Sequence, residues 1–179
     1  MSKKPFLIFS LIAVLIVGGL WLYCMPSLGK DAPKPTSTPS STLTQGTTLE
    51  EALVAAIDEV MAQNPEFNDN ARYLGIDTSM LTSLDEKGKA ALLTALEKYN
   101  LTVLDAPFEK LQQEGYIKDL IFTEGLFLQI EEEVVSGNEI ILYPSKWRST
   151  TLHIGCSQMV LTQSDSGWHL STIGNWWHM

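Results

Sequence analysis

An unbroken apolar run near the start of the chain, from Phe6 to Tyr23, constrains the fold more than any other feature. The run carries no charged residue and lies just after Lys3 and Lys4. As a helix, its eighteen residues would span about 27 Å and residues 5–25 about 31 Å, which matches the roughly 30 Å of hydrocarbon in a bilayer. We therefore expect residues 5–25 to form a transmembrane helix.

Two alternatives to a permanent anchor stay open. A cleaved signal peptide has a shorter apolar region and a small-x-small cleavage site, and Ser27-Leu28-Gly29 offers such a site. A bacterial lipoprotein would use Cys24, but the residue before it, Tyr23, is not small. Whether the segment is cleaved and whether Cys24 carries a lipid are not decided by the sequence.

The charges beside the apolar run predict its orientation. Lys3 and Lys4 would keep residues 1–4 in the cytoplasm as a short stub, because positive charges near a span favour the inner side. The expected location is the cell membrane, with a single pass, the bilayer as partner through Phe6 to Tyr23, and the C-terminal domain outside the cytoplasm.

Residues 26–47 are rich in Pro, Ser and Thr and nearly free of large apolar residues. Such a composition cannot bury enough surface to fold, so we expect a linker there. As a flexible coil it would span about 26 Å. The globular domain should then cover residues 48–179, close to the membrane surface.

Charge divides sharply at the linker. Residues 1–48 hold four Lys and one Asp, a net +3, whereas residues 49–179 hold eight Lys and Arg against twenty Asp and Glu, a net −12. An acidic domain is unsuited to non-specific nucleic-acid binding, which requires clustered cations. The acidity is typical of a soluble surface, and attraction of a cationic partner or Ca²⁺ is the alternative.

The first part of the domain has the period of helices. Thr47-x-x-Glu50 or Thr48-x-x-Glu51 forms a capping box ahead of an apolar stripe that ends at Asn64-Pro65. The stripe consists of Leu49, Leu53, Ala56, Ile57, Val60 and Met61. Ser83-x-x-Glu86 predicts the cap of a second helix, which Asn100 would end in a left-handed conformation.

The connections around these helices are less regular. Residues 67–80 show no period and are expected to be irregular. Residues 101–104 are a short strand candidate, and Asp105 with Pro107 opens a third helix that ends at Gly115.

After Lys118 the period changes to two, which predicts strands. Gly137-Asn138 indicates a hairpin between a strand that begins near Leu126 and one over residues 139–143. In a second hairpin, a bulge between Cys156 and Gln158 would bring both apolar segments to one face, and Leu161 would pair with Leu170. Helices followed by strands predict an α+β domain with helices packed on a mainly antiparallel four-stranded sheet, of NTF2-like or cystatin-like architecture.

Several C-terminal segments resemble those of small single-span exported proteins of Gram-positive bacteria, a group without an established function. They are Tyr143-Pro-Ser-Lys-Trp-Arg-Ser149, Gly155, Gly167-Trp168 and Gly174-Asn175-Trp176-Trp177. Some such proteins carry a transporter-permease label. One span without an intramembrane charge cannot form a solute pathway, so the label does not fit this chain. The resemblance implies no catalytic residue.

Residue types that carry chemistry are few. His153 lies near Cys156, but residues three apart on a strand face opposite sides, so Cys156 is expected to be a buried core thiol. His169 would be a half-exposed histidine facing Thr162. His153, His169 and His178 lack the close pairs of a zinc site, so no metal and no cofactor are expected. Glu131 and Glu133 share a strand face and would be a solvated surface or a weak cation site.

The candidate ligand-binding residues are Lys146, Trp147 and Arg148, on a segment expected to join two strands. Two cations around an indole suit a carboxylate, a phosphate or an aromatic ligand, since arginine presents a planar fork and tryptophan a stacking surface. Packing of Trp147 with solvated charges beside it is the competing interpretation. Trp168, Trp176 and Trp177 would pack the last strand against the helices, with an aromatic shelf for a ligand as the alternative.

No residue pattern predicts catalysis, so we identify no catalytic residue and an enzyme is the less favoured reading. The leading hypothesis is a membrane-tethered extracytoplasmic accessory or binding domain, non-enzymatic, whose partner is an envelope protein, a peptide or a glycan. The alternative is a small hydrolase that uses an unidentified carboxylate or histidine in a pocket.

Overall fold

The computed structural model describes residues 48–179. The predicted stub, transmembrane helix and linker, residues 1–47, lie outside the described residues. Among the helices of residues 48–179, none combines the length and the hydropathy that a membrane crossing requires.

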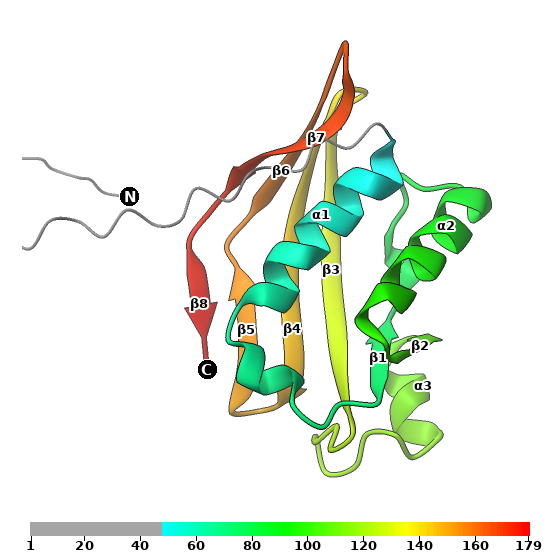
Figure 1. The fold of residues 1–179 in the computed structure, drawn as a ribbon, viewed down its shortest axis with the longest axis vertical. Coiled ribbons are helices and arrows are strands. Elements are labelled where there is room, and N and C mark those ends of the chain that lie inside the picture. Colours follow the sequence, from blue (N-terminus) through cyan, green and yellow to red (C-terminus); the bar gives the residue numbers. More distant parts are fainter. Residues whose placement is uncertain (1–47) are drawn as a thin grey trace, which may run out of the picture. The chain divides into compact units, whose positions relative to one another are not determined.

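The described residues form an α+β domain with a mixed sheet (Figure 1). Helical elements come first and the long strands last, as the change of period predicts. In chain order the elements are α1 (Leu49–Ala62), η1 (Pro65–Asn68), β1 (Tyr73–Ile76), η2 (Thr78–Met80), α2 (Glu86–Leu96), η3 (Glu97–Tyr99), β2 (Thr102–Asp105), α3 (Phe108–Gln113), β3 (Gly125–Ser136), β4 (Glu139–Ser149), β5 (Leu152–Cys156), β6 (Met159–Ser164), β7 (Gly167–Ile173) and β8 (Trp176–His178).

Helix α1 begins at the predicted capping box. The Thr48 side chain accepts a hydrogen bond from the Glu51 amide, and the Glu51 carboxylate accepts one from the Thr48 amide, so two otherwise unpaired amides are satisfied. The predicted apolar stripe is buried except for the partly exposed Leu49. The helix ends before Pro65, which cannot continue the hydrogen-bond ladder.

The predicted cap of α2 is wrong. Asp85 is the N-cap, with its carboxylate 2.7 Å from the amide nitrogen of Gly88. Ser83 instead donates from its amide and its hydroxyl to Glu132 on β3. Sequence spacing alone cannot choose between Ser83 and Asp85 as the cap, because the competing partner of Ser83, Glu132, lies far along the chain. Asn100 is left-handed, φ 59°, as predicted.

The sheet has eight strands, not the four expected. Five pairs are antiparallel: β3 with β4, β4 with β5 and with β6, β5 with β8, and β6 with β7. Strands β5 and β6 both pair with the same edge of β4, at different positions along it. On their other side, β8 pairs with β5 and β7 pairs with β6. Four long antiparallel segments are therefore present, two of them interrupted. The two further strands, β1 and β2, are parallel additions.

The predicted registers of the second hairpin are confirmed. Leu161 pairs with Leu170, and the ladder along β4 is interrupted at Ser157 and Gln158 between β5 and β6. Cys156 and Met159 consequently both lie in the core. The interruption in the neighbouring segment, Gly174-Asn175, faces this one: the Ser157 amide donates to the Asn175 carbonyl and the Gly174 amide to the Gln158 carbonyl.

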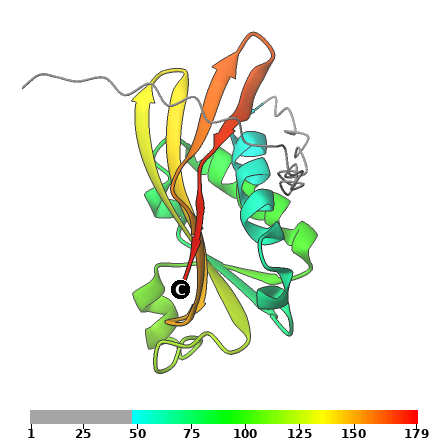
Figure 2. The ribbon, with the colours of Figure 1, turned by 90° about the vertical axis from the view of Figure 1, so that its left-hand side faces the viewer.

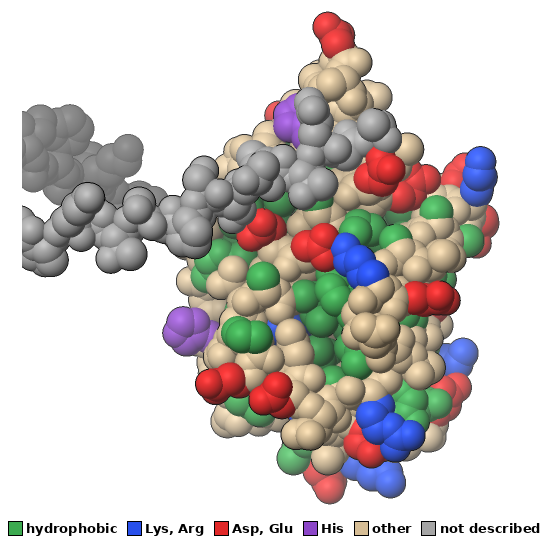
Figure 3. Space-filling view, viewed as in Figure 1, with side chains coloured by type: hydrophobic (Ala, Val, Ile, Leu, Met, Phe, Trp, Pro, Cys, Tyr) green, Lys and Arg blue, Asp and Glu red, His purple; other side chains and the backbone are tan. Residues whose placement is uncertain are grey.

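Helices cover the two faces of the sheet unequally. Figure 2 shows α1 and α2 on one side and α3 on the other. The main core lies under α1 and α2, and on that side hydrophobic side chains are visible among scattered acidic ones (Figure 3). A smaller core lies under α3 and contains Ala106, Leu111, Ile117, Phe122 and Phe127. The remainder of the α3 face carries the candidate site.

Strand β1 falls in the segment expected to be irregular. Leu74 and Ile76 are buried in the main core, whereas Gly75 lies against Leu111 and Phe127 on the other side. A four-residue strand covered on both faces has no alternation of apolar and polar residues, so the sequence does not reveal it. Its parallel partners, β2 and β3, lie far along the chain and supply its hydrogen bonds.

Candidate functional site

Lys146, Trp147 and Arg148 lie on β4 and not on a connection between strands, because β4 continues through Pro144 to Ser149. They do not converge on one ligand site. Lys146 is fully buried, on the side of the sheet that α1 covers. Its ammonium donates to the carbonyl oxygens of Met61 at 3.3 Å and Gln63 at 2.7 Å, and to the Asn68 side-chain oxygen at 2.9 Å. Burial lowers the pKa of Lys146 to about 8.

Arg148 has a similar structural role. Its guanidinium donates to the carbonyl oxygens of Phe67 at 2.8 Å, Asp69 at 2.7 Å and Thr123 at 2.6 Å. Both cations therefore hold the backbone that follows α1. Because successive strand residues face opposite sides, Trp147 lies on the other face, away from both. A single site made of all three residues is thus not what the strand builds.

Trp147 belongs to a row of aromatic side chains across the sheet. It pairs with Phe127 on β3 and with His153 on β5. Phe108, on α3, meets Trp147 edge-on, with ring centroids 4.8 Å apart, and also contacts Phe127 at 5.5 Å. Phe127 and Phe108 therefore hold the Trp147 indole in place, while part of its surface stays exposed to solvent.

His153 sits at the end of this row in a partly buried setting. Its Nε2 lies 3.1 Å from the Ser145 hydroxyl oxygen, and its ring packs edge-on against Trp177 at 4.8 Å. The Trp177 indole covers Gly155, where a Cβ would collide with it. Burial lowers the pKa of His153, which favours the neutral imidazole at pH 7.

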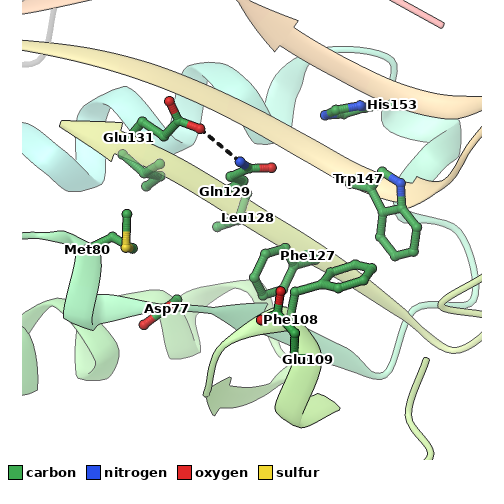
Figure 4. Close-up of a pocket in the computed structure, with 11 residues that line it drawn as sticks. Asp77, Met80, Phe108, Glu109, Phe127, Leu128, Gln129, Glu131, Trp147 and His153 are labelled. Carbon is green, nitrogen blue, oxygen red and sulfur yellow. Dashed lines mark hydrogen bonds between the residues drawn. The ribbon is translucent and has the colours of Figure 1, made fainter. Parts of the chain in front are cut away.

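An open cavity of about 450 Å³ lies beside this row (Figure 4). Its lining comes from the segment after β1, from α3 and from strands β3, β4 and β5. We call it the β3 groove. It is lined by Asp77, Met80, Phe108, Glu109, Phe127, Leu128, Gln129, Ile130, Glu131, Trp147 and His153.

The ionised side chains of the β3 groove are all carboxylates. Asp77, Glu109 and Glu131 line it, and no Lys or Arg does. Asp77 and Glu131 accept hydrogen bonds from the neutral groups of Ser79 and Gln129. In the described part of the chain, none of the four ion pairs involves these three carboxylates. The groove therefore carries uncompensated negative charge.

No family model, curated protein or solved structure matches the chain. The chemistry of the groove must therefore be inferred from its own residues.

The surroundings of the other residues considered from the sequence indicate a structural role. Cys156 is 2% exposed in the main core, as expected, and its thiol donates to the Gln158 carbonyl. His169 pairs with Thr162 across β6 and β7, and it is half-buried. Within residues 48–179, no group of three His, Cys, Asp or Glu side chains is arranged to hold a metal ion.

The glutamates of β3 have separate surroundings. Glu133 accepts a hydrogen bond from the Tyr143 hydroxyl. Glu132, between the two residues considered from the sequence, binds Thr82 and Ser83 and anchors the segment before α2. Glu131 alone faces the groove. Glu131 and Glu133 thus share a strand face but have different hydrogen-bond partners, Gln129 and Tyr143.

Four of the eleven groove residues carry no signal in the sequence. Asp77, Met80, Phe108 and Glu109 lie in short elements that long-range contacts bring to β3. The usable signal was the strand period itself. Along residues 145–149 this period places Trp147 on one face and Lys146 and Arg148 on the other.

Proposed function

We propose that the chain is a membrane-tethered, extracytoplasmic binding domain without enzymatic activity, and that the β3 groove holds its partner. The observation that carries this proposal is the groove itself: an aromatic-lined cavity with three carboxylates on its walls. Binding sites are typically concave and mostly apolar, with a few polar groups that orient the ligand. The proposed tether rests on the apolar run from Phe6 to Tyr23.

The absence of an acid and base pair favours binding over catalysis. In the described residues, the hydrogen-bond partner of the His153 ring is Ser145, and no carboxylate lies at hydrogen-bond distance. A general base needs a partner that orients it and a substrate proton within reach. The groove instead offers aromatic surface and fixed negative charge, which recognise a ligand without changing it.

A hydrolase is the second candidate, favoured by one observation. The Ser145 hydroxyl and His153 Nε2 are 3.1 Å apart, the distance of a nucleophile and its base. Ser145 is only 5% exposed, however, so a substrate carbonyl has little access to its oxygen. A fluorophosphonate probe should leave the protein unlabelled, and labelling that Ser145→Ala abolishes would place the hydrolase first.

We also propose that the domain has an NTF2-like or cystatin-like architecture. A long helix, α1, packs across a bent antiparallel sheet in NTF2-like and cystatin-like domains, and the packing of α1 on β4 and β7 supports that architecture here. The segments from Tyr143 to Ser149 and from Gly174 to Trp177 support a place among small exported proteins of Gram-positive bacteria.

Site-specific photocrosslinking tests the proposed binding role. A photoreactive amino acid placed at Gln129, an exposed groove residue, should yield a discrete adduct in the native cells. The matched control is the exposed Lys87, on α2 at the other face, which should yield none. Equal adducts from both positions, or none from Gln129, would contradict a groove-bound partner.

A further inference from the structure

Strand β3 extends well beyond its neighbour on one side. Strand β1 pairs with β3 only over Gly125 to Leu128. From Gln129 to Ser136, in the described chain, the strand partner of β3 is β4 alone. In an antiparallel strand, alternate residues direct their amide and carbonyl groups away from the partner. Half of the residues from Gln129 onward therefore present backbone groups to the side that β1 has left.

The β3 groove lies at this edge, ahead of the point where Glu132 binds Thr82 and Ser83. It is lined by five consecutive β3 residues, from Phe127 to Glu131. Of these, Phe127, Gln129 and Glu131 share a face with Trp147 and His153, since alternate residues of a strand lie on the same side. The cavity therefore lies on this face of the sheet and extends across β3 to the side on which β1 has ended. Asp77 and Met80, just after β1, form its far wall (Figure 4).

The surroundings of the edge favour a basic segment. Glu109 and Glu131 are exposed at the groove, and Asp77 lies opposite β3. Between them, Phe108 and Trp147 offer aromatic faces, which attract both apolar and cationic side chains. Met80 is 53% exposed, and its flexible side chain adapts to varied partners.

We propose that the β3 groove binds an extended, basic peptide segment of a partner protein, which adds as a strand along β3 beside Gln129 to Glu131. This inference rests on the proposed binding role and narrows the partner to a peptide. Main-chain hydrogen bonds to β3 supply affinity, as in other strand-addition complexes. Lysine or arginine side chains reach the carboxylates, and the apolar residues between them contact Phe108 and Trp147.

Peptide selection tests the chemistry of the partner. A phage library of random twelve-residue peptides is selected on the full chain in nanodiscs, with empty nanodiscs for counter-selection. We expect enriched peptides with lysine or arginine alternating with apolar residues. Glu109→Gln with Glu131→Gln should weaken a synthetic copy of such a peptide about fivefold, because two exposed charge contacts are removed. Glu97→Gln, on η3, is the matched control and should change nothing.

Backbone methylation tests the strand pairing. The enriched peptide is made in two forms, each with methyl groups on alternate backbone nitrogens, so that one form blocks one edge. One form should lose binding at least tenfold and the other should keep it. If both forms bind equally, or if the enriched peptides lack basic residues, the inference is overturned.

The two proposals can fail separately. If no peptide is enriched while the Gln129 photocrosslinker still yields a discrete adduct in cells, the peptide inference is wrong and the binding role stands. If the adduct is also missing, the binding role falls with it.

Discussion

Lys146 carries its ammonium into a site without a carboxylate. Its partners are the carbonyl oxygens at the C-terminus of α1 and the Asn68 side chain. The last carbonyls of a helix have no partner within the helix, and the negative end of the helix dipole lies there. Lys146 therefore compensates both the unpaired carbonyls and the dipole, although burial of its charge is costly.

The pKa of Lys146 predicts how stability changes at alkaline pH. The folded pKa of about 8 lies below the ordinary 10.5, so between these values the unfolded chain binds more protons and stability rises with pH. Lys146→Met removes this contribution. We expect the stability of wild type relative to Lys146→Met to increase from pH 8 to 10, at most by about 1.4 kcal/mol per pH unit.

Urea unfolding of the full chain at pH 7.5, 8.5 and 9.5 measures this difference. The exposed Lys87→Met is the control and should track wild type. A gap between wild type and Lys146→Met that stays constant over the range would contradict the expectation.

The lowered pKa of His153 predicts a loss of stability at acidic pH. Its folded pKa is lowered from 6.5 by burial, so below pH 6.5 the unfolded chain takes up a proton that the folded chain refuses, and stability falls. His153→Gln keeps a polar partner for Ser145 and cannot titrate. We expect a smaller drop in Tm between pH 7.5 and 5.0 for this variant, whereas His178→Gln, at an exposed position, should follow wild type.

Among the helices and strands, features that depend on residues close in sequence could be predicted, whereas features that depend on distant residues could not. The capping box of α1, the Gly137-Asn138 hairpin and the pairing of Leu161 with Leu170 depend on residues close in sequence, and all three are present. Strand β1 and the true cap of α2 depend on partners far along the chain. No period or spacing in the sequence records such partners.

The candidate site was partly predictable for the same reason. Trp147 could be singled out as an aromatic residue among polar neighbours, and it does line the groove. The carboxylates of Asp77 and Glu109 lie there because β1 stops at Ile76 and α3 packs on Phe127. The positions of these two carboxylates depend on the topology of the sheet, which the spacing of residues in the sequence does not predict.

The attachment of β8 depends on a glycine. An added Cβ at Gly155 would collide with the Trp177 indole, so we expect Gly155→Ala to cost about 1–3 kcal/mol. Trp177→Ala should cost less in the Gly155→Ala background than in wild type, because removing the indole there also relieves the collision. Chemical unfolding of the four proteins measures this coupling.

Gly137→Ala is the control for this cycle. A Cβ at Gly137 would meet no atom within 4 Å, so the free energy of unfolding should change by no more than about 0.5 kcal/mol. Strict additivity of the Gly155 and Trp177 changes would contradict the packing of the two residues.

For the whole molecule, charge and hydropathy separate along the chain. The apolar run precedes a part that carries a net −12. We expect the full chain to stay with membranes through alkaline carbonate washing, because a buried apolar helix is not released by salt or base. Leu11→Lys with Leu15→Lys should release it, whereas Lys87→Met should not. Release of the unmodified chain by carbonate would contradict a spanning anchor.

The two facing interruptions, Ser157-Gln158 and Gly174-Asn175, limit how the chain can change its length. They are hydrogen-bonded to each other. Each one also changes which of the alternating side chains of its segment face the core. Deleting one residue from either would turn every following side chain of that strand to the wrong side. During evolution or engineering, a one-residue deletion here therefore requires a compensating insertion in the same segment, which returns the following side chains to the core.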